Sequence, residues 1–161
     1  MMTAAMFAML AGVAIYAFRV VYLSWFGGQA RIEMSISLDR AIEEMVRDLR
    51  EATEVQSTSG YNEIRSMQGG KAYIYYLYNS VDSYGPPPAF NEASYELRKV
   101  ELPDGINGSF TYGEGKIMTA DILPPLATDI SITDNLVTID ISVSRNDEII
   151  RTRTEVRPRG L

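Results

Sequence analysis

The sequence predicts an α+β fold in which a long N-terminal helix, hydrophobic and then amphipathic, packs on a small antiparallel β-sheet. Three observations support this prediction. No residue from Met1 to Phe18 is charged, apolar residues recur at helical spacing from Ala30 to Thr53, and apolar and polar residues alternate in several segments from Lys71 onward. Spacings of three and four are typical of a helix, and strict alternation is typical of a strand. We expect one helix from about Thr3 to Thr53 and a sheet of about four or five strands.

The composition narrows the possible functions. The 161 residues suffice for one domain with, at most, an appended segment. A net charge of −6 argues against bulk binding of nucleic acid, whose phosphates attract basic proteins. The absence of Cys and His removes thiol chemistry, the commonest general base and the commonest metal ligand. We therefore expect no enzymatic activity, no cofactor and no metal site.

The apolar N-terminal segment predicts a transmembrane or assembly helix over residues 1–28. Eighteen helical residues rise about 27 Å, just short of the apolar core of a bilayer. Arg19 interrupts the run, and Val20–Phe26 then extends it with the interface-favouring residues Tyr22 and Trp25. The side chains expected to pack against lipid or other protein are Met6, Phe7, Leu10, Val13, Ile15, Phe18, Tyr22 and Trp25.

Two alternatives for this segment stay open. A cleavable signal peptide would want a basic N-terminal region, which is missing, although residues 28–30 (Gly-Gln-Ala) form a small-x-small triplet. The nearby basic residues Arg19, Arg31 and Arg40 all lie on the C-terminal side, which by itself would place the domain in the cytoplasm. A basic leader that once preceded Met1 would reverse this orientation.

Residues 29–161 are predicted to form the globular domain, with an amphipathic helix over 29–54 and the sheet and loops over 55–161. One face of this helix carries an apolar stripe that we expect to pack on the sheet. The stripe consists of Met34, Leu38, Ile42, Met45 and Leu49. The opposite face is charged and is expected to be solvated. It carries Asp39, Arg40, Glu43, Glu44, Arg47, Asp48, Arg50 and Glu51. A coiled-coil partner is an open alternative, although the heptads are few.

Four segments have the composition and alternation of strands. They are Lys71–Tyr78, Ser94–Leu102, Val137–Ser144 and Glu148–Val156. The first two are expected to pair across the proline-containing loop of residues 80–91, and the last two to form a C-terminal hairpin. The Gly-rich residues 103–116 are expected to be mostly turn.

Three groups of residues suggest binding chemistry, and each has a plainer structural explanation. Stacking on bases or sugars is possible for Tyr73, Tyr75, Tyr76 and Tyr78. Binding of phosphates is possible for Arg151, Arg153, Arg157 and Arg159. Binding of calcium is possible for Asp129, Asp134, Asn135 and Asp140. Tyrosines are also ordinary strand residues, and arginines on an outer strand discourage edge pairing. The acidic group lacks a calcium-loop spacing. We favour the structural explanation for all three groups.

The stretch YAFRVVYLSWFGGQARIEMSISLDRAIEEMVRDLREA resembles the helix of the type IV pilin-like superfamily. Within it, the chain is most similar to the minor pilins and minor pseudopilins of the PilW and GspJ kind. The resemblance rests on Phe18-Arg19, on Ser24-Trp25, on the L-x-R-A motif beginning at Leu38 and on the RDLR-x-A motif ending at Ala52. The strands IYYLYNS and YELRKVEL and the C-terminal TEVRPRGL are also similar to that group.

This resemblance implies a pilin-like fold and a structural subunit of a type IV pilus or type II secretion pseudopilus, assembling through its N-terminal helix. The implied partners are other pilin or pseudopilin subunits, an inner-membrane assembly platform and, before assembly, membrane lipid. The implied location is the bacterial inner membrane with the globular domain in the periplasm, followed by a periplasmic or extracellular filament.

One feature departs from the family pattern, since such proteins mature to a start with glutamate as the fifth residue, whereas position 5 here is Ala5. Either the chain begins at an internal Met, or it resembles the tip-type pseudopilins that lack this glutamate. Two other functions remain as alternatives. One is a membrane-anchored extracytoplasmic binding module for DNA or glycan that uses Tyr73–Tyr78 or the C-terminal arginines. The other is an exported enzyme with a signal cleaved after Ala30.

Overall fold

The computed structural model describes residues 2–58, 60–85, 90, 92–124, 128–145 and 148–160, without the side chains of 2–8, 26, 27 and 30. The chain forms two compact units, Met1–Glu33 and Met34–Leu161. The division therefore follows Glu33, whereas the sequence predicted a boundary after residue 28. The three prolines of the predicted loop, residues 86–88, lie outside the described residues.

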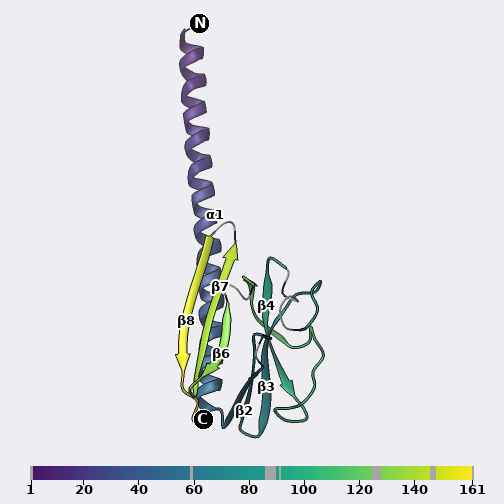
Figure 1. The fold of residues 1–161 in the computed structure, drawn as a ribbon. Helices are drawn as coiled ribbons and strands as arrows, with labels where there is room; N and C mark the ends of the chain where they lie inside the picture. Colours follow the sequence, from purple (N-terminus) through teal and green to yellow (C-terminus); the bar gives the residue numbers. More distant parts are fainter. Residues whose placement is uncertain are drawn as a thin grey trace. The chain divides into compact units, whose positions relative to one another are not determined.

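One helix, α1, spans Met2–Glu51 and includes residues of both units (Figure 1). No proline interrupts its sequence, and the helix continues through Gly28, where a glycine lowers helix stability by about 1 kcal/mol relative to alanine. At its C-terminus Ala52 donates a hydrogen bond to the Leu49 carbonyl, and Thr53 donates to the Met67 carbonyl at 2.8 Å. This second bond joins the end of the helix to a strand of the sheet.

The second unit contains eight strands in the part of the chain that the structure describes. They are β1 Glu54–Thr58, β2 Glu63–Gln68, β3 Lys71–Tyr78, β4 Tyr95–Leu102, β5 Lys116–Ile122, β6 Asp129–Thr133, β7 Leu136–Arg145 and β8 Glu148–Val156. All described pairings are antiparallel, in the order β1-β2-β3-β4-β5-β7-β6, with β8 on β7. Consecutive strands pair in most cases, as expected for short connections.

The strands predicted from alternation are confirmed as β3, β4, β7 and β8, and so are both predicted pairings, β3 with β4 and β7 with β8. The sequence analysis missed β1, β2, β5 and β6. The turn between β6 and β7 consists of Asp134 and Asn135, which have φ angles of 50° and 64°. Two successive positive φ angles fit a tight hairpin turn, so these two residues serve to turn the backbone.

The sheet curls instead of lying flat. β5 joins β7 through the single pair Ile122↔Val143, while β6 lies close to β1 and β2. There the backbone N–H of Ile130 donates to the Asn62 side-chain oxygen at 3.4 Å. Figure 1 shows β6, β7 and β8 grouped beside the second half of α1, and β2, β3 and β4 forming another layer.

The fold class predicted from the sequence is wrong. The prediction was a small sheet of four or five strands packed on a long helix, hydrophobic and then amphipathic, whereas the described strands form an eight-stranded, curled sheet and hold more residues than the helix. The chain is therefore mostly β. The error arose because the four missed strands are short or rich in polar residues, which weakens the alternation signal.

The predicted membrane location is also wrong. Among the residues that the structure describes, no helical segment is both long enough and apolar enough to cross a bilayer. This finding contradicts the predicted transmembrane helix over residues 1–28 and the inner-membrane localisation that followed from it. The charged Arg19 falls inside the only apolar run of the described helix.

Two hydrophobic clusters lie on opposite faces of β3. Tyr75 and Leu77 belong to the cluster that packs against α1, while Ile74 and Tyr76 belong to the second cluster, which includes Ile106. Successive side chains of a strand point to opposite faces, so one tyrosine-rich strand supplies both clusters. The helix contributes to the first cluster the five residues of the predicted stripe, Met34, Leu38, Ile42, Met45 and Leu49, all of which are buried.

Replacing Leu38 tests the helix contribution to this core. Leu38 is 0 % exposed, so Leu38→Ala leaves a cavity and is expected to lower the free energy of unfolding by about 2–5 kcal/mol. The control is Ile36→Ala on the same helix, where the side chain is 45 % exposed and the expected change is within about 0.5 kcal/mol. Urea denaturation measures both values. Equal losses for the two variants would contradict the packing described above.

Candidate functional site

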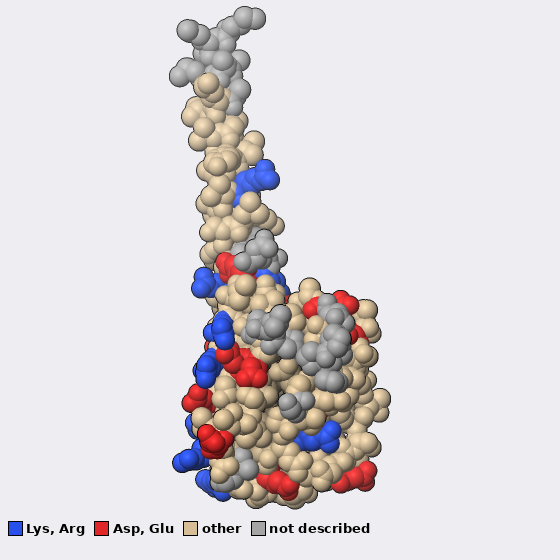
Figure 2. Space-filling view, viewed as in Figure 1, with Lys and Arg blue, Asp and Glu red and all other residues tan. Residues whose placement is uncertain are grey.

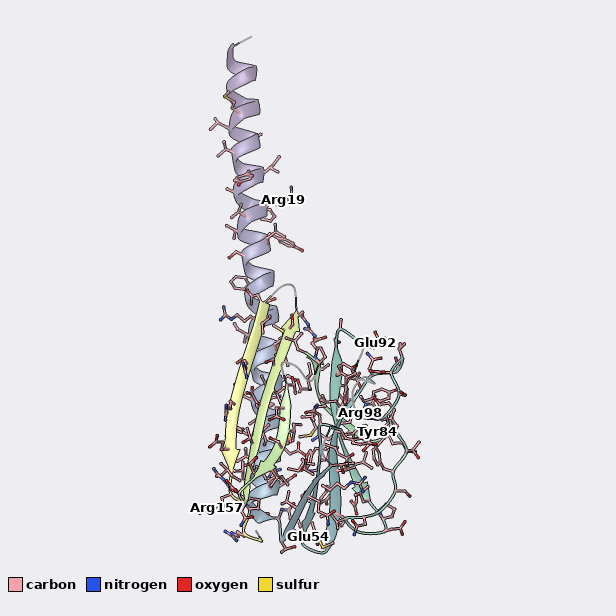
Figure 3. All side chains as sticks on the ribbon, viewed as in Figure 1. Arg19, Glu54, Tyr84, Glu92, Arg98 and Arg157 are labelled. Atoms are coloured by element: carbon pink, nitrogen blue, oxygen red, sulfur yellow. The ribbon has the colours of Figure 1, made fainter. Side chains whose placement is uncertain are left out.

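The first unit presents a continuous apolar surface. Its described large apolar side chains between Met9 and Trp25 are exposed by 50 % at Val20 to 78 % at Met9. Figure 2 shows this segment as a tan surface interrupted by blue, and Figure 3 labels Arg19 on it, the only charged residue between positions 9 and 25. An exposed apolar surface of this extent marks a site of interaction.

Small residues within this segment allow another backbone to approach closely. Ala11, Gly12, Ala14 and Ala17 lie among the larger side chains, and a Cβ atom added at Gly12 would meet no atom within 4 Å. Small residues at helix–helix interfaces allow close packing of the two backbones. Phe18 and Tyr22, one turn apart, stack with ring centroids 6.4 Å apart and form a broad aromatic surface.

Six of the eight residues predicted for packing are exposed in the structure. They are Leu10, Val13, Ile15, Phe18, Tyr22 and Trp25. The other two, Met6 and Phe7, lie outside the described side chains. These six exposed side chains lie on several sides of the helix, because their spacings in the sequence do not all repeat at the three- and four-residue intervals of a single stripe. Contact with more than one neighbour would be needed to cover them.

A partly buried ionic cluster, here called the clasp, joins the second half of α1 to the sheet. It consists of Glu44 and Asp48 on α1, Tyr75 on β3, Lys99 on β4 and Lys116 on β5. The Lys99 ammonium lies 3.0 Å from Glu44 and 2.5 Å from Asp48, and Lys116 lies 2.6 Å from Glu44. The Tyr75 hydroxyl donates to Asp48 at 2.7 Å. Asp48 is only 4 % exposed, so its charge depends on these partners.

The clasp shifts the acid–base properties of its members. Burial raises the pKa of Asp48, but the hydrogen bonds from Lys99 and Tyr75 outweigh burial and hold that pKa below its ordinary value of 3.8. Burial lowers the pKa of Lys99, but the hydrogen bonds to Asp48 and Glu44 outweigh burial and raise it. Burial, followed by the hydrogen bond to Asp48, raises the pKa of the Tyr75 hydroxyl. At neutral pH Asp48 is therefore a carboxylate, Lys99 an ammonium group and Tyr75 a neutral phenol.

The sequence analysis assigned Glu44 and Asp48 to a solvated face, and that assignment is wrong. Both carboxylates border the apolar stripe, because each directly precedes one of its members, Met45 or Leu49. The signal that could have revealed the clasp lies on β4, where Lys99 shares a face with the inward residue Leu97. A lysine on the inner face of a strand needs a carboxylate partner from the element that covers it.

The tyrosines considered as a possible stacking surface do not form one, and the favoured structural explanation is confirmed for Tyr75 and Tyr76. Tyr75 and Tyr76 are 0 % exposed and lie on opposite faces of β3, and Tyr73 and Tyr78 are partly buried. The Tyr76 hydroxyl donates to the Glu114 carbonyl at 2.7 Å and so helps to hold the loop of residues 103–115. These rings are therefore part of the domain's packing.

The C-terminal arginines are partly neutralised by neighbouring carboxylates. Arg151 forms a two-pronged ion pair with Asp140, at 2.8 and 2.6 Å, and Arg153 lies 3.2 Å from Glu155. Asp140 is thus engaged with an arginine, which removes it from the possible calcium ligands. Across the described residues, no group of three or more Asp or Glu side chains is arranged to hold a metal ion.

Acidic pH tests the clasp. Asp48→Asn removes the charge that binds Lys99 and is expected to lower the free energy of unfolding at pH 7 by about 1.5–3 kcal/mol. Because the pKa of Asp48 is lower in the folded chain than its ordinary 3.8, its stabilisation is complete above pH 3.8 and is lost as the pH falls through the folded value. The difference between the wild type and Asp48→Asn should therefore shrink below pH 3.8.

The matched control for this experiment is Glu43→Gln, which removes the same charge from the exposed side of the same helix. Its effect at pH 7 is expected to stay within about 0.5 kcal/mol. Urea denaturation between pH 2.5 and pH 7 measures both variants. A constant difference between the wild type and Asp48→Asn over this range would mean that Lys99 and Asp48 do not form the ion pair.

The chain matches no family model, no curated protein and no solved structure. The resemblance to the pilin-like superfamily therefore stays a prediction from the helix motifs.

Proposed function

We propose that this chain is a structural subunit that assembles with other pilin-like subunits through its N-terminal helix, in the manner of a minor pilin or minor pseudopilin. The observation that carries the proposal is the exposed apolar segment of α1 between Met9 and Trp25. Burial of one large apolar side chain stabilises an assembly by about 1.5–3 kcal/mol. A segment with many such side chains can therefore drive association.

The two halves of α1 differ in what they contact. Residues 34–51 pack on the sheet through the apolar stripe and through the clasp. Residues 9–25 keep their apolar side chains exposed and include small residues that let other helices approach. This division supports a subunit in which one half of the helix holds the domain and the other half contacts neighbouring subunits.

The surroundings of the residues considered for ligand binding favour assembly as the function. The tyrosines of β3 are committed to packing, and Arg151 and Arg153 are paired with acidic groups. A net charge of −6 also opposes association with nucleic acid. The expectation that the chain has no catalytic role stays a prediction.

Cysteine crosslinking tests the proposed assembly, since the chain has no cysteine of its own. Single cysteines replace Leu10, Val13, Ile15 or Phe18, and cells that produce the full chain are treated with a crosslinker that carries one maleimide and one photoreactive benzophenone. The benzophenone inserts into C–H bonds, so the neighbouring subunit needs no thiol. We expect crosslinks to other subunits that vary in yield along the helix, because a specific interface brings only some positions close to a neighbour. Electrophoresis of the cell extract, with detection of the chain, measures the yield.

The control is Asp104→Cys, an exposed position in the loop that follows β4. This variant should give little crosslinked product, since its position is remote in sequence from the helix. Equal crosslinking at all four helix positions would indicate non-specific clustering of apolar segments. That result, or the absence of crosslinks at every helix position, would contradict the proposed function.

A further inference from the structure

A cavity of about 370 Å³ opens in the second unit where the ends of β3, β4 and β5 meet. Its wall includes Tyr78, Asn79, Ser94, Glu96, Arg98 and Asp121. The volume lies within the range of clefts that hold small molecules. None of the lining residues belongs to α1, so this cavity is separate from the proposed assembly surface.

The cavity lies beside an irregular part of the sheet. Tyr95 pairs with Ile122 and Leu97 pairs with Thr119, so one residue of β4 opposes two residues of β5. The second of those two, Asp121, has a φ angle of 59°, a left-handed conformation that is rare for residues other than glycine. Bulges that redirect a side chain and strained residues both occur preferentially at functional sites.

Two carboxylates on the cavity wall are held in place by arginines. Arg98 binds Glu96 through Nε at 2.9 Å and Nη2 at 2.7 Å, and its third nitrogen donates to the Gly113 carbonyl. The same guanidinium lies 4.2 Å from the centre of the Tyr78 ring. Arg145 binds Asp121 through Nε at 2.9 Å and Nη2 at 2.6 Å.

These contacts fix the polar groups of the wall before any ligand arrives. Figure 3 labels Arg98 on β4, in the same layer as the aromatic group that includes Tyr84. Asp121 lies on β5 and is bound by an arginine of β7, whereas Glu96 lies on β4 and is bound by an arginine of the same strand. Fixed polar groups bind a ligand with a smaller loss of conformational entropy than mobile ones do.

The charge of the wall indicates the class of ligand. Each carboxylate is balanced by its arginine, so the wall is strongly polar and nearly neutral. The carboxylates of Glu96 and Asp121 would repel an anion, and the guanidinium of Arg98 would repel a cation. A hydroxyl group both donates and accepts, and therefore suits a wall that offers carboxylate acceptors, guanidinium donors and the exposed hydroxyls of Ser80 and Ser94.

We propose that this cavity binds a neutral saccharide, whose hydroxyl groups are recognised by Glu96, Arg98 and Asp121. The size of the cavity suits one or two sugar rings, and the mixture of fixed acceptors and donors suits neighbouring hydroxyls. The site would give the subunit a recognition function in addition to its proposed role in assembly.

A glycan array followed by calorimetry tests the proposal. The purified full-length chain is applied to immobilised neutral and acidic oligosaccharides, and the best neutral ligand is then titrated against the wild type and two variants. Asp121→Asn keeps a residue that tolerates a positive φ but removes the carboxylate. Ala120→Trp places a large side chain at an exposed position of the wall. Each variant is expected to bind at least tenfold more weakly than the wild type.

The matched control is Asp134→Asn, which makes the same chemical change at a positive φ of 50° in the β6–β7 turn, outside the cavity wall. It should bind like the wild type, and circular dichroism shows whether each variant is folded. The proposal is overturned if no neutral saccharide binds, if only acidic glycans bind, or if both folded cavity variants keep wild-type affinity. None of these outcomes depends on whether the chain assembles into filaments.

Discussion

The salt bridge between Lys99 and the two carboxylates of α1 is the contact on which the second unit depends. An apolar stripe with a regular helical period can pack on a sheet in several positions, each displaced by one turn. The ammonium of Lys99 meets Glu44 and Asp48 in only one of these positions. Breaking a buried ion pair leaves an unpaired charge, which costs more than the pair contributes when it is intact. We infer that the clasp selects the helix position, while the apolar stripe supplies most of the stabilisation.

The strand β3 connects the helix to the rest of the second unit through contacts on both of its faces. Tyr75 donates to Asp48 and joins the helix-facing cluster, so β3 is held on one face by the clasp. The opposite face of β3 binds the loop of residues 103–115 through Tyr76. That loop in turn receives Arg98, whose guanidinium forms part of the cavity wall. The helix, the sheet and the cavity are thus connected through two adjacent residues of one strand.

The sequence predicted the regular parts of this structure better than the irregular parts. The stripe from Met34 to Leu49 and the strands β3, β4, β7 and β8 carry strong patterns of apolar residues, and these patterns come from burial in the two hydrophobic clusters. The strands β1 and β6 are five residues each and carry several polar side chains, so their alternation is too short to read. The size of the sheet was underestimated for this reason.

The candidate sites were harder to predict because each one combines residues that are distant in sequence. Lys99 meets Asp48 across 51 positions, and this distance cannot be inferred from local spacing. The cavity depends on a bulge in β5, which arises from how β4 and β5 pair and not from a residue pattern. The exposed apolar segment was predicted because its signal is simple composition. The predicted membrane location was wrong, because an apolar composition does not by itself make a helical segment long enough and apolar enough to cross a bilayer.

The outer edge of β8 affects how such chains behave when they are crowded together. In the part of the sheet that the structure describes, β8 pairs with β7 alone, which makes it an edge strand, the kind of strand on which separate molecules can stack into aggregates. Arg151 and Arg153 lie exposed on this strand, each beside a carboxylate. Pairing of two copies along this edge would take these charged side chains out of water, which costs free energy. The charged side chains of β8 therefore oppose growth of the sheet from one molecule to the next.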